Sequence, residues 1–148
     1  MFDVKLLKES IRSGTIASIV IMPVGFISKY LGLRIGHYGP KLAETLFGNT
    51  SQAVLMAQHL VIGWLSAAPL LVALVMIGNR ASPVLMGAIY GMGYYLVINS
   101  LALPFLFGDL TPWQLGFSYI YPSLIGHILF GASIGFTARK FLKSSSHK

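Results

Sequence analysis

The chain has 148 residues, of which 55% are hydrophobic and only 10% are charged. Its length suits one domain, and its mean hydropathy of +0.72 is too high for a water-soluble surface of this size. The net charge of +7 does not indicate nucleic-acid binding, because most basic residues cluster near the two chain ends beside apolar runs, where anionic lipids attract them. The absence of cysteine excludes disulfides, thiolate metal sites and cysteine catalysis.

Four long apolar segments follow along the chain, and each is expected to cross a bilayer as a helix. We expect these helices at about 11–33, 51–77, 83–107 and 119–140. Lys29 lies inside the first segment, where its long side chain is expected to reach toward the membrane surface. The sequence therefore predicts an all-α fold, in which a four-helix transmembrane bundle forms one domain over 1–148.

A short amphipathic helix is expected between the first two membrane segments, at about 40–47. Leu42 and Leu46 fall on one face of it, Lys41 and Glu44 fall away from that face, and Gly48 follows its end. This pattern is typical of a helix that lies in the membrane interface.

The basic residues that flank the segments orient the chain. If the N-terminus is inside, the inner side holds Lys5, Lys8, Arg12, Arg80, Arg139, Lys140, Lys143 and Lys148, and the outer side holds Lys29, Arg34 and Lys41. Because basic residues concentrate on the cytoplasmic side of membrane proteins, we expect both termini in the cytoplasm.

Two pairs of short matches favour a duplicated helical hairpin. His59-Leu-Val-Ile-Gly63 in the second segment matches His127-Ile-Leu-Phe-Gly131 in the fourth, and Gly14-Thr-Ile-Ala-Ser18 matches Gly87-Ala-Ile-Tyr-Gly91 in the first and third. Since each hairpin starts on the inner side, the repeats are parallel and related by an axis along the membrane normal. The alternative is coincidence in a sequence rich in Gly, Leu, Ile and Ala.

These patches also resemble a known family. Gly-x-Ile-x-small in the odd helices, with His-apolar-apolar-apolar-Gly ahead of the basic C-terminus, is similar to the YagU-like small inner-membrane proteins of bacteria. The resemblance covers four short patches of the chain. It implies a location in the bacterial inner membrane and assigns no chemistry.

The few polar side chains inside the predicted helices fall at a similar depth. His59, His127 and Asn99 each lie eight residues from the expected outer end of their helix, which is about 12 Å along a helix axis. Gln58 neighbours this layer, and Lys29 lies just above it. Because polar groups inside a bilayer are costly, these five residues are candidate ligands of a pocket that opens outward. Such a pocket suits the handling or transport of a small solute, a proton or a lipid headgroup.

Two other interpretations of this layer remain open. In the first, the polar side chains only hydrogen-bond between helices, as they do in many bundles without a ligand. In the second, His59 and His127 hold a haem b iron or a divalent metal, because the second and fourth helices of an up-down bundle lie diagonally opposite. This arrangement resembles that of membrane b-type cytochromes, with Gly63, Gly87, Gly91 and Gly131 expected to make room.

Small residues at a spacing of four favour close helix contacts. Gly87-x-x-x-Gly91 and Gly131-x-x-x-Gly135 fit helix packing within the monomer, and also a homo-oligomer or a larger membrane complex in which this chain is a non-catalytic accessory subunit. No phosphate-binding, metalloprotease or serine-hydrolase motif occurs in the sequence, so we do not expect an enzyme. The expected partners are membrane lipids.

Overall fold

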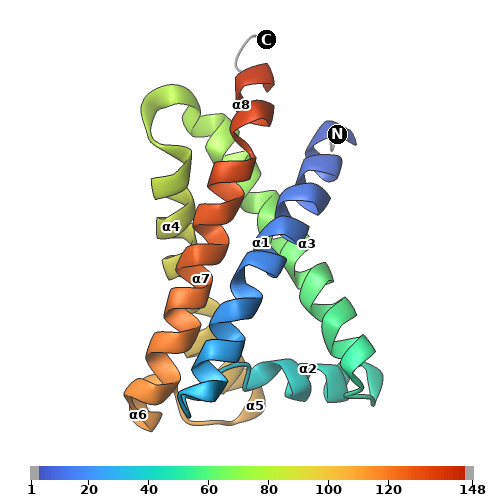
Figure 1. Cartoon of the computed structure of the whole chain (residues 1–148), viewed down its shortest axis with the longest axis vertical. Helices are drawn as coiled ribbons and strands as arrows, with labels where there is room; N and C mark the ends of the chain where they lie inside the picture. The colour runs from blue at the N-terminus through green and yellow to red at the C-terminus, as the bar shows by residue number, and fades with distance from the viewer. Residues whose placement is uncertain (1–3, 146–148) are drawn as a thin grey trace.

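The computed structural model describes residues 4–145, which form helices and loops without any β-strand. Four helical stretches within these residues are long and apolar enough to cross a membrane, which confirms the all-α four-helix fold (Figure 1). They are α1 (Val4–Tyr30), α3 (Gln52–Ile77), the run of α4 (Pro83–Tyr94), η2 (Tyr95–Ala102) and α5 (Leu103–Phe107), and α7 (Phe117–Thr137). The shorter elements are α2 (Tyr38–Phe47), η1 (Gly78–Arg80), α6 (Pro112–Leu115) and α8 (Arg139–Ser145).

The helix bounds differ from the expected ones mainly in the first and last segments. α1 begins at Val4 rather than at 11, because backbone hydrogen bonds continue a helix whether or not its side chains are apolar. It ends at Tyr30 rather than at 33, because Gly32 takes a left-handed φ of 70° and Leu33 donates its N–H back to the Ser28 carbonyl at 2.8 Å. α7 ends at Thr137, and α8 carries the helical chain on to Ser145.

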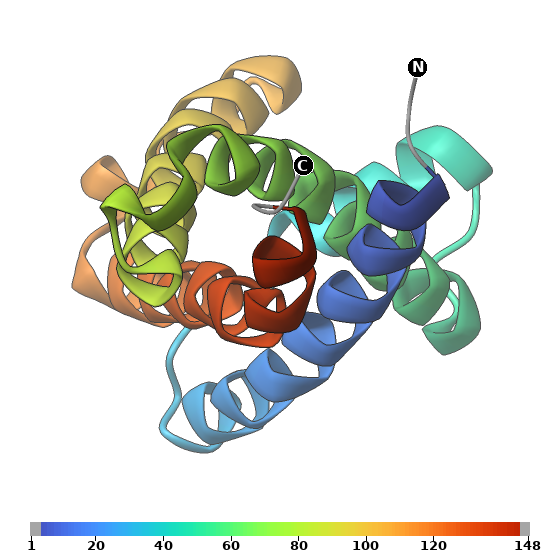
Figure 2. The ribbon, with the colours of Figure 1, turned by 90° about the horizontal axis from the view of Figure 1, so that it is seen from above.

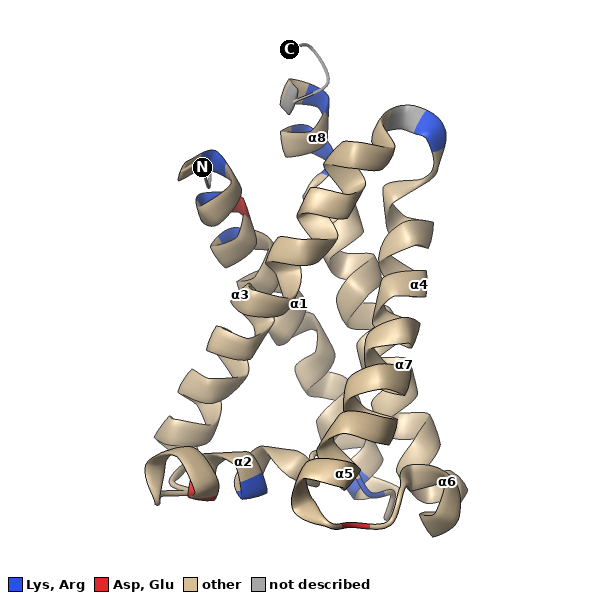
Figure 3. Ribbon diagram, turned by 180° about the vertical axis from the view of Figure 1, so that it is seen from behind, with Lys and Arg blue, Asp and Glu red and all other residues tan. Residues whose placement is uncertain are grey.

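Charged residues lie at the two ends of the bundle and leave its middle uncharged (Figure 3). Both described chain ends lie at one end together with the turn that contains Arg80, and we call this the basic end. The opposite end, where α2 lies, is called the α2 end. The described basic residues of the basic end are Lys5, Lys8, Arg12, Arg80, Arg139, Lys140 and Lys143. Lys148, which was counted with them above, lies outside the described residues.

The four long helices form two hairpins that pack in the same way. α1 packs on α3, and α4 packs on α7. A Cβ added to Gly14 would lie 2.7 Å from the Gly63 carbonyl oxygen, and one added to Gly87 would lie 2.7 Å from the carbonyl carbon of Gly131. These are the positions that match between the proposed repeats, so both hairpins use equivalent positions for a close helix contact.

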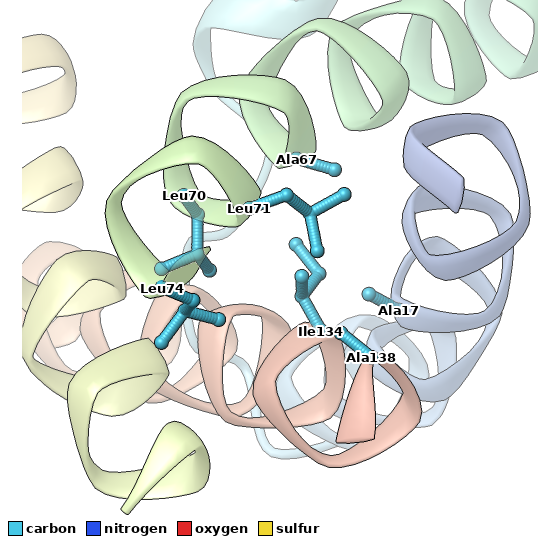
Figure 4. Packing of buried hydrophobic residues seen from close by; sticks show 7 residues of the cluster. All are labelled: Ala17, Ala67, Leu70, Leu71, Leu74, Ile134 and Ala138. Atoms are coloured by element: carbon cyan, nitrogen blue, oxygen red, sulfur yellow. The ribbon is translucent and has the colours of Figure 1, made fainter. Parts of the chain in front are cut away.

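The two hairpins meet mainly through α1 and α7, which run side by side when the bundle is seen from above (Figure 2). Toward the basic end, α1, α3 and α7 enclose an apolar core (Figure 4). Its buried members are Ala17, Ala67, Leu70, Leu71, Leu74, Ile134 and Ala138. Since the small side chains of Ala17 and Ala138 face the leucines of α3, the helices approach closely around this apolar cluster.

The third membrane stretch changes its winding between α4 and α5. η2 is a π-helix, and the N–H of Leu103 after it donates to the carbonyl of Ile98, five residues back. Pro104 accounts for this change, because proline has no N–H to donate and its ring clashes with the carbonyl four residues earlier, which here is that of Ser100. A wider turn removes the clash and keeps the neighbouring backbone groups bonded.

Candidate functional site

His127 lies in the middle of α7 against two tyrosines of the neighbouring stretch. Its ring stacks on Tyr94, with 5.6 Å between ring centroids, and lies 5.8 Å from the ring of Tyr95 at a tilt of 56°. Its Nδ1 is 2.6 Å from the carbonyl oxygen of Ser123, one helical turn earlier. Because a carbonyl only accepts, Nδ1 carries the proton in this bond, and Nε2 of the neutral ring is free to accept or to bind a ligand.

His59 lies on α3 and turns toward α1. Its Nε2 is 3.4 Å from the carbonyl oxygen of Ser18, a long hydrogen bond that leaves Nδ1 of the neutral ring as an acceptor. His59 and His127 are close enough to interact electrostatically. Each imidazole is therefore held by a backbone carbonyl through one nitrogen and keeps the other nitrogen available.

The remaining three predicted site residues lie in different surroundings. Gln58 is buried, and its Nε2 donates to the carbonyl oxygen of Gly39 in α2 at 3.0 Å. Asn99 is half-buried on η2, and its side chain has no hydrogen-bond partner within residues 4–145. Lys29 is exposed in the last turn of α1, at the rim of the α2 end and away from the buried layer.

Several buried polar atoms outside the apolar core have no hydrogen-bond partner in the described part of the chain. They are Ser18 Oγ, Gln58 Oε1, Tyr95 OH and Ser100 Oγ. Ser18 contacts His59 through its backbone, Gln58 precedes His59, and Tyr95 contacts His127. Two of the four unpaired atoms, those of Ser18 and Tyr95, therefore belong to residues that contact an imidazole.

Tyr95 and Ser100 were not among the residues that the sequence analysis selected. Their side chains are 0% and 1% exposed, although they are five residues apart and would point in different directions on an α-helix. In a π-helix, hydrogen bonds join residues five apart, and the wider turn brings residues at this spacing closer to one face than an α-helix does, so both side chains can be buried. Pro104, near the end of an apolar segment, is the only sign of this arrangement in the sequence.

The rim of the site at the α2 end is built from α2 and the loop after α5. Tyr38 is buried and stacks on Phe107, with ring centroids 6.0 Å apart and an interplanar angle of 12°. Burial raises the pKa of the Tyr38 phenol, and the nearby Asp109 carboxylate and Tyr95 phenol raise it further. Tyr38 is thus buried close enough to Asp109 and Tyr95 to interact electrostatically with both.

Asp109 carries the negative charge of this rim. Its Oδ2 accepts a hydrogen bond from Lys41 Nζ, and His37 Nε2 is 3.6 Å from the same oxygen. The hydrogen bond from Lys41 lowers the pKa of the Asp109 carboxyl, and the charges of Lys41 and His37 act in the same direction. Asp109 is therefore ionised at neutral pH and holds α2 to the loop.

A second polar cluster, also missed from the sequence, lies at the basic end. Glu9 is only 8% exposed and accepts hydrogen bonds at 2.7 Å from both Arg12 and Ser13. Arg12 also donates to the carbonyl oxygen of Thr137, at the end of α7, at 2.7 Å. Because Arg12 joins Glu9 of α1 to the end of α7, the cluster is a structural clasp between these two helices. The spacing of three between Glu9 and Arg12 is the signal that was available in the sequence.

The surroundings of the histidines do not suit a haem. A Cβ added to Gly91 would lie 2.7 Å from the carbonyl carbon of His127, and one added to Gly63 would lie 3.3 Å from the carbonyl oxygen of Gly14. Gly87, Gly131 and Gly135 face backbone just as closely. The space beside these glycines is occupied by the facing helices, so it is not available to a porphyrin ring. Within the described residues, no three histidine, aspartate or glutamate side chains are grouped to hold a metal ion.

Comparisons of the chain with protein-family models, with curated proteins and with solved structures found no match. The resemblance to the YagU-like proteins stays a prediction.

Proposed function

We propose that this multi-pass membrane protein moves a small polar solute or a proton through a buried polar site in its α2-end half. The observation that carries the proposal is the set of four buried oxygens without partners in the described residues, two of which belong to residues that contact His59 or His127. An unpaired buried polar atom costs roughly 1–3 kcal/mol, so four of them in a small bundle favour the binding of water or a small polar ligand there.

Polar groups elsewhere in the bundle are paired, which argues against a purely structural role for this layer. Trp64 Nε1 donates to Thr15 Oγ1 at 2.8 Å, and Tyr90 OH donates to the Ser66 carbonyl oxygen at 2.8 Å. These are complete interhelical hydrogen bonds of the kind that stabilises membrane bundles. The layer around the histidines has the donors and acceptors for such bonds but leaves several of them unused.

The chemistry of the layer indicates the class of ligand. It offers phenol and serine hydroxyls, an amide oxygen and two imidazole nitrogens, and no ionised carboxylate. A multivalent ion would need fixed opposite charge at such a depth. A small neutral solute or a proton needs only hydrogen-bond partners and a group that titrates near neutral pH. The apolar core toward the basic end closes the path beyond the site, so passage through the protein requires a conformational change.

The side from which the ligand enters follows from the distribution of charge. Seven described basic residues lie at the basic end, and Lys29, Arg34 and Lys41 lie at the α2 end. We propose that the basic end is cytoplasmic and that the site opens toward the outer side of a bacterial inner membrane.

Flux into liposomes that contain the purified protein tests this function. Glycerol and urea serve as neutral probes, followed by light scattering during osmotic swelling. Protons are followed with an internal pH dye while potassium and valinomycin hold the membrane potential. We expect faster entry of at least one probe than into protein-free liposomes, and slower entry for His127→Ala and Tyr95→Phe.

Tyr121→Phe is the matched control, because it removes the same hydroxyl from a side chain of α7 that is 52% exposed. The proposal fails if none of the probes enters faster than into protein-free liposomes. It also fails if Tyr95→Phe and Tyr121→Phe have equal flux.

A further inference from the structure

α2 lies across the α2 end and is fastened to both hairpins (Figure 3). On one side, the carbonyl of Gly39 accepts the hydrogen bond from Gln58 of α3. On the other side, Lys41 pairs with Asp109, and Tyr38 stacks on Phe107 at the end of α5. The loop before α2 is attached to α7 as well, because Arg34 donates its N–H to the Ser118 carbonyl oxygen at 3.1 Å, and Trp113 of α6 packs edge-on against Tyr95 with 6.5 Å between ring centroids.

We propose that α2 is a strap that closes the polar site and opens by releasing Asp109. The inference rests on the function proposed above, because it concerns access to that same site. In the closed arrangement, Tyr38 is buried against Phe107 and interacts electrostatically with Tyr95, while Trp113 of α6 packs on Tyr95, so α2 and α6 together close the site toward the α2 end. When Lys41 leaves Asp109, α2 swings away with Tyr38 and exposes the inward face of η2.

The chain on both sides of α2 suits such a swing. Gly36 before the helix has a φ of 73°, and Gly48 after it has a φ of 59°. A left-handed backbone at glycine costs little and changes readily, so α2 is bounded by two positions at which the chain can pivot. No Cβ at either position would meet another atom within 4 Å, so neither glycine is required for close packing.

The fastening at Asp109 is the part of the strap that is easiest to break. The side chains of Lys41 and Asp109 are 37% and 24% exposed, so water competes for both charges. His37, which directly precedes α2, is the other titratable side chain that faces Asp109. An ion pair with this exposure contributes little, and its loss changes an equilibrium by about two- to fivefold.

A single engineered thiol reports on opening, because the natural chain has no cysteine. Ser100→Cys puts it on the inward face of η2, where the serine is 1% exposed and has no hydrogen bond to lose. The protein is placed in lipid nanodiscs, so both ends are open to solvent. Modification by a positively charged, membrane-impermeant methanethiosulfonate is then timed. Thr50→Cys, in the exposed loop after α2, gives the rate for a free thiol.

We expect Ser100→Cys to react slowly in the closed strap and about two- to fivefold faster when Asp109→Asn is added. Asp109→Lys places two cations together and should accelerate the reaction further. The reversed pair, Lys41→Asp with Asp109→Lys, restores the attraction and should slow it again. Equal rates in all four backgrounds would overturn the strap.

A cysteine in the apolar core separates opening from unfolding. Ala138 is fully buried near the basic end, far from α2, so Ala138→Cys should stay protected in every background. If Asp109→Asn exposes Ala138→Cys as much as Ser100→Cys, the variant loosens the whole bundle and the strap is wrong.

The outcomes also separate this inference from the proposed function. If the modification rate of Ser100→Cys changes with the Asp109 variants but no probe enters the liposomes faster, the strap is supported and the transport function is rejected. If the flux depends on His127 but the modification rate of Ser100→Cys is the same in all Asp109 variants, the transport function is supported and the strap is rejected.

Discussion

Gly91 and Gly93 lie two residues apart on α4 but face different surroundings, so they form a matched pair of substitutions. A Cβ at Gly91 would lie 2.7 Å from the carbonyl carbon of His127 and closer still to its oxygen. Since real Cβ atoms do not approach backbone within 3.0 Å, Gly91→Ala must push α4 and α7 apart. A Cβ at Gly93 would meet no atom within 4 Å.

The expected free-energy changes have opposite signs. Overpacking of a close contact costs about 1–3 kcal/mol, whereas replacing glycine by alanine inside a helix gains about 0.5–1 kcal/mol. The net expectation is that Gly91→Ala lowers the free energy of unfolding by about 1–2 kcal/mol. Gly93→Ala leaves it unchanged or raises it by up to about 1 kcal/mol.

Both values are obtained by titrating the protein from mild micelles into dodecyl sulfate and following helix content by circular dichroism. The fitted midpoint and slope give the free energy of unfolding for each variant. If Gly91→Ala is as stable as Gly93→Ala, the closest contact of α4 and α7 does not run through Gly91, and the packing described above is wrong.

Three further outcomes follow from the polar contacts. Arg12→Ala removes hydrogen bonds to Glu9 and to the end of α7, and because Arg12 is half exposed we expect a loss of only about 1–2 kcal/mol in the same titration. Tyr90→Phe removes the bond to the Ser66 carbonyl and should cost about 0.6 kcal/mol. The Asp109 carboxyl, followed by NMR, should titrate below its usual pKa of 3.8, because hydrogen bonding to Lys41 favours the ionised form. The contribution of this pair to stability is therefore present at neutral pH and is lost only as the pH falls through that lowered pKa.

Each of these outcomes has a control. Arg80→Ala changes an exposed cation of the basic end and should leave stability within about 0.5 kcal/mol. Tyr94→Phe removes a hydroxyl that has no hydrogen bond in residues 4–145, so it should cost less than Tyr90→Phe. Lys41→Ala should return the pKa of Asp109 toward 3.8, and an unchanged pKa would mean that Lys41 is not its partner in solution.

Part of the candidate site could be read from the chain because it depends on residue type and on distance along one helix. His59, His127 and Gln58 were recognisable as polar groups inside apolar segments. Tyr95 and Ser100 were not, because an α-helix would turn them to different faces and only the π-helix before Pro104 aligns them. The buried Glu9 was missed because it precedes the expected start of the first helix.

The apolar runs of this sequence determine its fold class, since a segment of about 20 apolar residues without charge is stable only as a helix in lipid or in a protein core. The number of such runs and the spacing of glycines and charges were also visible without coordinates. Tertiary structure alone decided which face of each helix is buried, that α2 is fastened to both hairpins, and that the glycines beside the histidines face backbone rather than open space. These features depend on contacts between residues far apart in the chain, such as Lys41 with Asp109. A local sequence pattern does not show which distant residues come into contact.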